Sequence, residues 1–185
     1  MMKFSNRAIA LGMAAALTMG AGAAWAKNPM VGGAAMYSSK TIVENAVNSR
    51  DHTTLVAAVK AAGLVDTLSG PGPFTVFAPT NAAFGKLPAG TVNTLVMPEN
   101  KSALTNILTY HVVAGRLTST DIAAKIRSGR GKATLTTVQG EPLTARMMGK
   151  WLVLTDSKGG TSRVTTANVM QSNGVIHVVD TVLMP

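Results

Sequence analysis

The sequence predicts an α+β fold, with helices in the first half of the chain and strands in the second. From Thr41 to Ile126, apolar residues recur mainly three and four positions apart, which is the spacing of helices that bury one face. After Arg127 the pattern changes to period two with many β-branched residues, as in half-buried strands. Helices and strands do not alternate along the chain, so a sheet of repeated βαβ units is not expected.

Breaker and capping residues divide the first half into short helices. Apolar stripes begin at Thr41 and again at Thr53, and Gly63 stands where a helix stops. The loop Ser69–Pro73 is too rich in Gly and Pro for regular structure, and Thr80 is placed to cap the helix after it. Besides the helices that start near Thr41 and Thr53, we expect helical segments over Leu64–Leu68, Asn81–Lys86, Thr91–Val96, Asn100–Thr109 and Ser119–Ile126.

Strands are predicted by short β-branched or apolar runs between turn signals. Phe74–Ala78 is a short buried strand that ends at Pro79, and Tyr110–Val113 leads from a helix into a second strand. Asn173-Gly174 is a tight hairpin signal. The later strands are expected over Ala133–Val138, Pro142–Met148, Trp151–Thr155, Arg163–Met170 and Val175–Leu183.

The first 26 residues have the three parts of a removable secretion signal. Lys3 and Arg7 precede an uncharged stretch, Ala8–Ala24, and Ala24-Trp25-Ala26 supplies a small-x-small cleavage site. The alternative is a transmembrane anchor, but the apolar run is only about long enough to span a bilayer and leads straight into the cleavage site. We therefore predict cleavage after Ala26 and a secreted or periplasmic protein.

The remaining chain has the length of one domain. Residues 27–40 contain Gly, Met and Pro without a clear period, and they are predicted to form a flexible arm before a domain over residues 41–185. The sequence has no cysteine, which excludes disulfides, thiolate metal sites and thiol nucleophiles. An exported domain of this kind is held together by packing alone.

The positive charge is concentrated in one segment. Two of the 17 basic residues lie in the leader, so the chain from Lys27 carries 15 basic and 8 acidic residues, a net charge of +7. The segment Ile122–Arg163 holds eight of the basic residues against Glu141 and Asp156. A basic surface attracts phosphate, sulfate and carboxylate groups. Export argues against nucleic acid, so the expected partners are an anionic glycan, an acidic protein or, peripherally, lipid headgroups. The alternative is a face that only solubilises the domain.

The stretch Lys125–Lys132 (KIRSGRGK) is the candidate for electrostatic binding to an anionic surface. It lies between the last predicted helix and the first of the later strands, and its two glycines indicate an exposed loop. Such binding should be sensitive to salt. The candidate residues are Lys125, Arg127, Arg130 and Lys132.

The local signatures of an enzyme are missing, and neither a metal nor another cofactor is predicted. His52, His111 and His177 do not stand at HExxH or HxH spacing, and there is no Gly-x-Ser-x-Gly elbow. The eight carboxylates form no suggestive pair. Distant residues can still converge in a fold, so a periplasmic hydrolase or a small-ligand carrier is the alternative function. A deep polar pocket around a Ser, His and Asp set would favour it.

Three segments resemble the fasciclin-like domain family, in the order in which the family has them. GPFTVFAPTNAAFGKLP (Gly72–Pro88) resembles its first signature segment, and ILTYHVVAGRLTSTD (Ile107–Asp121) its central Tyr-His segment. ANVMQSNGVIHVVDTVLMP (Ala167–Pro185) is similar to its closing segment. The resemblance runs from about Thr41 to Pro185. It implies a wedge: a bent β-sandwich of about seven strands with helices packed along one edge.

The resemblance also implies an exported, non-catalytic binding or cell-adhesion module for a protein or glycan at the cell surface or matrix. One soluble copy of the domain cannot bridge two surfaces by repetition, so we expect a monomer or a weak homo-oligomer that binds one partner. In animal members, the Tyr-His pair and its apolar flanks are linked to receptor binding. The corresponding residues here are Ile107, Leu108, Tyr110, His111, Val112 and Val113.

The alternative for the Tyr-His pair is structural. It follows a predicted helix and opens an apolar strand, so one of its two side chains should point inward. A histidine among apolar neighbours is most often a core residue whose ring nitrogens are hydrogen-bonded.

Overall fold

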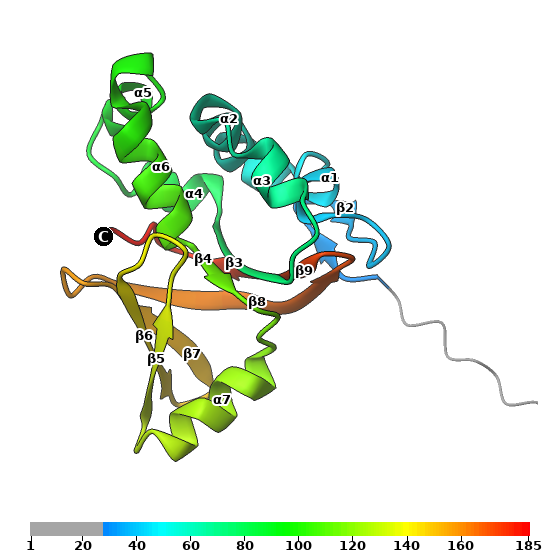
Figure 1. Ribbon diagram of the computed structural model, residues 1–185, viewed down its shortest axis with the longest axis vertical. Coiled ribbons are helices and arrows are strands. Elements are labelled where there is room, and N and C mark those ends of the chain that lie inside the picture. Colours follow the sequence, from blue (N-terminus) through cyan, green and yellow to red (C-terminus); the bar gives the residue numbers. More distant parts are fainter. Residues whose placement is uncertain (1–27) are drawn as a thin grey trace, which may run out of the picture.

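A seven-stranded sheet organises residues 28–185, which the computed structural model describes (Figure 1). Its strands are β3 (Phe74–Pro79), β4 (Val112–Ala114), β5 (Lys132–Thr136), β6 (Pro142–Met148), β7 (Trp151–Thr155), β8 (Thr161–Gln171) and β9 (Gly174–Val179). Their order is β4-β3-β9-β8-β7-β6-β5, antiparallel throughout except for the parallel pair β3 and β9. The predicted leader, residues 1–26, lies outside the described residues.

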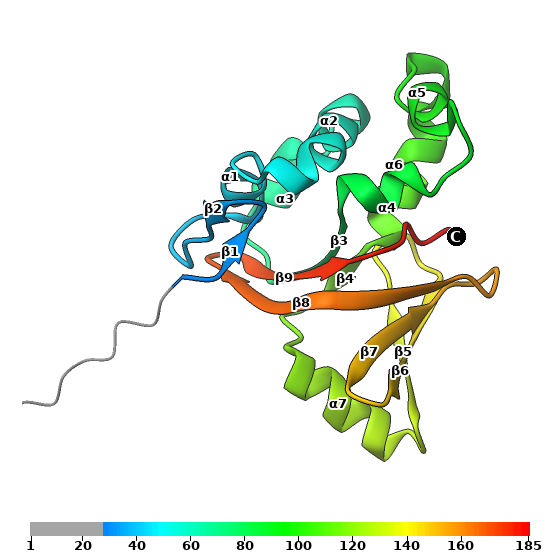
Figure 2. The same cartoon turned by 180° about the vertical axis from the view of Figure 1, so that it is seen from behind.

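The helices are divided between two sides of the sheet. They are α1 (Ile42–Ala46), α2 (Thr53–Ala62), α3 (Val65–Ser69), α4 (Asn81–Gly85), α5 (Thr91–Leu95), α6 (Lys101–Tyr110) and α7 (Ser119–Ser128), with 3-10 turns at Arg50–His52 and Pro98–Asn100. Figures 1 and 2 show α1 to α6 gathered on one side, whereas α7 lies apart against β5 and β6. The predicted α+β class and the wedge of about seven strands are confirmed. The sequence did not predict that α7 lies apart from the other helices.

Capping residues set the helix ends. The Thr41 hydroxyl accepts a hydrogen bond from the Glu44 backbone N–H, and the Glu44 carboxylate accepts one from the Thr41 N–H, at 3.3 and 2.7 Å. The hydroxyl of Thr80 accepts from the Ala83 N–H at 3.2 Å, as the sequence predicts. Gly63 ends α2 at a φ of +73°, in the left-handed region that glycine adopts without strain.

The two central strands separate two hydrophobic cores. Val76 on β3 and Ile176 on β9 face the core formed with helices α1 to α6. Phe77, the residue after Val76, and Val179, three residues after Ile176, face the second core, which is formed with β5 to β8 and α7. A bridge between Val113 and Thr137 brings the two ends of the sheet together. Because both faces of β3 and β9 are covered, their sequences are almost continuously apolar.

The segment predicted as a flexible arm instead contains a hairpin. Strands β1 (Met30–Val31) and β2 (Ala34–Ala35) pair across Gly32 and Gly33, both at positive φ. Val31 and the following Met36 are buried in the helix-side core. Two strands of two residues are too short to show a period, which is why the sequence pattern indicates only flexibility.

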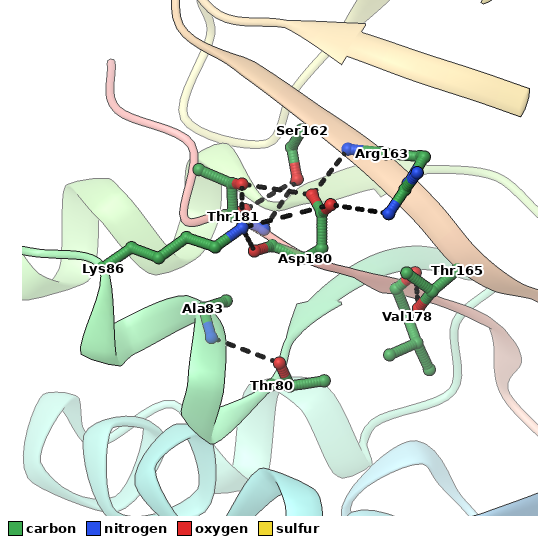
Figure 3. A network of polar contacts seen from close by, with 9 residues as sticks. All are labelled: Thr80, Ala83, Lys86, Ser162, Arg163, Thr165, Val178, Asp180 and Thr181. Atoms are coloured by element: carbon green, nitrogen blue, oxygen red, sulfur yellow. Dashed lines mark hydrogen bonds and ion pairs between the residues drawn. The ribbon is translucent and has the colours of Figure 1, made fainter.

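The last strand is shorter than the predicted Val175–Leu183, because polar contacts draw the chain out of the sheet after Val179. Figure 3 shows them around Asp180: the Lys86 ammonium donates to the Asp180 carbonyl at 2.5 Å and to the Thr181 hydroxyl at 3.1 Å. The Asp180 carboxylate also forms an ion pair with Arg163 at 3.5 Å. These contacts direct the C-terminal residues back over the second core, where Leu183 is buried.

The side chain of Asn173 ties the β8–β9 hairpin to the helices. Its oxygen accepts from the Ile42 N–H at 3.0 Å, and its nitrogen donates to the carbonyls of Leu68 and Gly70 at 2.8 and 2.9 Å. Asn173 is buried, so each of these backbone groups would lose its partner without being reached easily by water. The sequence predicts the turn here but not these contacts, which join residues more than 100 positions apart.

Replacing Asn173 by Ala should lower the free energy of unfolding by about 3 kcal/mol, because three hydrogen bonds are lost, two of them buried, and their partners stay unsatisfied. Urea denaturation of both proteins at neutral pH measures the difference. Asn48→Ala is the control, since exposed Asn48 makes one bond to the Glu44 carbonyl. Equal stability of the two variants would contradict this role.

Candidate functional site

The segment predicted to bind a partner lies in the interior. Every one of its six residues exposes less than a tenth of its surface: Ile107, Leu108, Tyr110, His111, Val112 and Val113. Tyr110 is the last residue of α6 and His111 is its C-cap, so the strand begins two residues later than predicted. In this conformation the segment offers no side chain to a partner, and the structural alternative is the one that the geometry supports.

His111 and Tyr110 link distant parts of the fold. The Nδ1 atom of His111 lies 2.8 Å from the Ile107 carbonyl oxygen, and its Nε2 accepts from the Leu183 N–H at 3.0 Å. This arrangement places the ring proton on Nδ1, and burial lowers the pKa of His111 to about 4. The Tyr110 hydroxyl donates to the Pro142 carbonyl at 3.0 Å and accepts from the Ser157 N–H at 3.1 Å.

Ser49 and His52 form a buried pair that the sequence pattern did not predict. The Ser49 hydroxyl lies 2.8 Å from Nδ1 of His52, and Nε2 of His52 has no hydrogen-bond partner among the described residues. Both residues line an apolar cavity of about 30 Å³, and a neighbouring cavity of about 40 Å³ touches His111. Small-molecule sites usually have about 300 Å³ or more, so neither cavity has room for a substrate or a carried ligand.

Residues 28–185 contain no cluster of metal ligands and no membrane-spanning helix. No group of three or more His, Asp or Glu side chains in this range could hold a metal ion. Within the same range, no helix combines the length and the apolar character needed to cross a membrane.

The exposed basic residues gather at one end of the β-rich half. Two turns meet there: Gly129–Gly131 between α7 and β5, and Gly149–Lys150 between β6 and β7 (Figure 1). The register explains the meeting, because Lys132 pairs with Arg146 and Met148 with Trp151. We name this end the basic tip; its cations are Lys125, Arg127, Arg130, Lys132, Arg146 and Lys150, all exposed.

The turn that carries the predicted anion-binding residues is tight rather than a long loop. Lys125 and Arg127 lie on α7, Arg130 has a φ of +56°, and Lys132 begins β5. The N–H of Gly131 donates to the Ile126 carbonyl at 2.9 Å, which closes the turn. The structure therefore holds all four cations on a defined backbone at the surface.

The tip brings like charges together with few acids nearby; Asp121 lies one helical turn before Lys125, within reach of its charge. Lys132 and Arg146 are directly opposite on neighbouring strands, an arrangement that destabilises a sheet. The segment's two acids are remote: Glu141 precedes the start of β6 and Asp156 follows the end of β7, both at the other end of these strands. Stability therefore does not account for this arrangement of charges.

An exposed tryptophan lies within the tip. The Lys150 ammonium is 5.2 Å from the centre of the Trp151 ring, and the Arg163 guanidinium carbon is 4.8 Å from it, both within range of a cation–π contact. Trp151 also borders an open groove of about 440 Å³ that runs along α7 past Ser119 and Arg127. The sequence does not predict that these residues lie near Lys132, because their proximity depends on the register of the strands.

The fold is that of a fasciclin domain. The Fasciclin domain model matches residues 50–185, and the chain belongs to this family. It is 49% identical to protein sll1483 of Synechocystis over 161 residues, which cover 86% of this chain and 81% of that protein. It is 38% identical to immunogenic protein MPB70 of Mycobacterium bovis over 153 residues, covering 80% of this chain and 70% of the other.

A solved structure supports the same fold. It is a FAS1 domain pair from the insect cell adhesion molecule fasciclin I, with a TM-score of 0.69 and 20% sequence identity. The match covers 79% of this chain and 51% of that one, so this chain spans about half of the domain pair. At this identity the likeness concerns the fold alone.

His111 should make the stability depend on pH. Its folded-state pKa of about 4 lies below the ordinary 6.5, so the unfolded chain binds more protons between these values. The free energy of unfolding should therefore be fully present above pH 6.5 and fall by about 3 kcal/mol as the pH drops to 4. Burial also lowers the pKa values of His52 and His177, which adds to the loss in the same direction.

The comparison of urea unfolding from pH 7.5 to 4 between the parent and His111→Ala isolates this contribution. The variant should be less stable at pH 7.5 by about 3 kcal/mol, because the Leu183 N–H is left unpaired and a cavity forms. Its stability should also fall less steeply with acid. Equal slopes for the two proteins would show that His111 is not the titrating group.

Proposed function

We propose that this protein is an exported, non-catalytic interaction module that binds an anionic glycan or acidic protein at the cell surface or matrix. The observation that carries the proposal is the basic tip, where six cations are exposed and the acids of the same segment lie at the opposite end of the strands. A surface of one sign attracts and orients partners of the other sign.

The family supports an interaction role. Fasciclin I, whose domain pair has the same fold, is an insect cell adhesion molecule. The interior of the present protein supports a non-catalytic role, because His52 and His111 border only cavities of about 30 and 40 Å³. The Ser49–His52 pair is buried, and so cannot reach a substrate in this conformation.

The tip favours an electrostatic contact rather than a deep pocket. Its cations stand on α7, β5 and β6 and in two turns, so they form a surface supported by regular structure. Solvent-exposed charges are screened over about 8 Å at physiological ionic strength, so binding should weaken as salt is added. A single domain of this kind binds one partner at this surface, as a monomer or a weak homo-oligomer.

Neutralising the predicted cations should weaken retention on a heparin column. Arg127, Arg130 and Lys132, each replaced by Gln, should make the protein elute at clearly lower salt than the parent, because half of the cations of the tip are removed. The control replaces Lys40, Lys60 and Lys101, three exposed lysines on the helical side, and changes the net charge equally. Equal elution of the two triple variants would refute a localised site.

Export itself has a direct test. In the native host, the protein recovered outside the cytoplasm should have the intact mass of a chain that begins at Lys27. Ala26→Leu should block processing, because the cleavage site requires a small residue there, whereas Ala21→Leu, outside the small-x-small site, should be cleaved normally. A parent protein that retains Met1 and stays in the cytoplasm would contradict export.

A further inference from the structure

Three exposed apolar side chains gather at the end of the β6–β7 hairpin. Met147, Met148 and Trp151 expose 42, 58 and 39% of their surface, whereas the other large exposed apolar residues of the described chain come from separate elements. Scattered apolar residues on a surface are normal, but a cluster on one turn indicates a contact. Met147 pairs with Leu152 and Met148 with Trp151, so both faces of the hairpin end are apolar.

The cluster lies among the cations of the tip. Lys150 is in the turn itself, Arg146 directly precedes Met147, and Lys132 pairs with Arg146 from the neighbouring strand. Arg127 lines the same groove as Met147 and Trp151. The surface therefore combines an apolar end with a surrounding group of positive charges.

This combination fits the boundary of an anionic lipid bilayer. Headgroup phosphates complement Lys and Arg, and each basic residue near such a surface strengthens the attraction. Tryptophan prefers the depth where headgroups meet acyl chains, and the cations can extend from there to the phosphates. A soluble glycan would satisfy the cations but would leave the exposed methionines in water.

We infer that the basic tip docks the protein peripherally on an anionic phospholipid surface, with Met148 and Trp151 at the boundary between headgroups and acyl chains. The inference uses the cations of the proposed function and adds a partner and an apolar contact. Figures 1 and 2 place α5, α6 and the C-terminus away from the tip. Docking would therefore leave the helical side of the domain free.

Trp151 reports the docking directly. The chain has two tryptophans, so Trp25→Phe leaves Trp151 as the one emitter whether or not the leader is removed. Vesicles of phosphatidylcholine with phosphatidylglycerol should shift the emission of Trp151 to the blue, and brominated acyl chains should quench it. Vesicles of phosphatidylcholine alone should do neither. An unchanged, unquenched emission on the anionic vesicles would overturn the inference.

A pair of double variants separates the apolar contact from charge. Met147→Ser with Met148→Ser keeps every cation and should weaken sedimentation with the anionic vesicles by about ten-fold or more. The control, Met97→Ser with Val138→Ser, removes two exposed apolar side chains elsewhere and should sediment like the parent. Both doubles should keep the parent's urea unfolding curve, since all four positions are exposed.

The heparin column separates this inference from the proposed function. The Met147 and Met148 double should elute from heparin like the parent, because its cations are intact. Equal vesicle binding by the parent and this double would refute the lipid contact while leaving the proposed function standing. An equal loss of heparin retention by the control variant, which neutralises Lys40, Lys60 and Lys101, would refute the proposed function, and the emission of Trp151 would still decide the lipid contact.

Discussion

The parallel pairing of β9 with β3 is the constraint on which the rest of the structure depends. It places the C-terminal strand β9 inside the sheet, between β3 and β8. Successive residues of each strand then face different cores, so neither face is left for solvent. The last residues must close over the second core, and there the Leu183 N–H meets Nε2 of His111. Burial of the Tyr-His segment therefore follows from this pairing.

The position of the basic tip follows from the same arrangement. The two cores are covered by the helices, by α7 and by the folded sheet, and strands β5 to β7 lie on the side of the sheet away from helices α1 to α6 (Figure 2). Lys132 and Arg146 face each other at the basic tip, where water screens their repulsion and lowers its cost. The fold can thus tolerate there a charge density that its interior could not hold.

Local patterns predicted most elements, but not their partners. Thr80 and Gly63 act as the cap and the stop that their positions indicate, because a helix end needs only neighbouring residues. The parallel pair joins Phe74 to Gly174, and no local pattern encodes contact across 100 positions. The sequence predicted one part of the basic tip, the cations between Lys125 and Lys132. It did not predict the contribution of Trp151, which depends on the register of β5, β6 and β7.

The family resemblance and the candidate site occupy different parts of the chain. The three segments that resemble the family supply β3, β4, β9 and the buried His111, which build the sheet centre and its closure. The tip lies between the second and third segments, on α7 and the β5–β7 meander. Because the residues shared with the family close the two cores, the hairpins between those segments are free to vary in sequence. In this protein, the turn between β6 and β7 combines exposed charge with exposed apolar side chains.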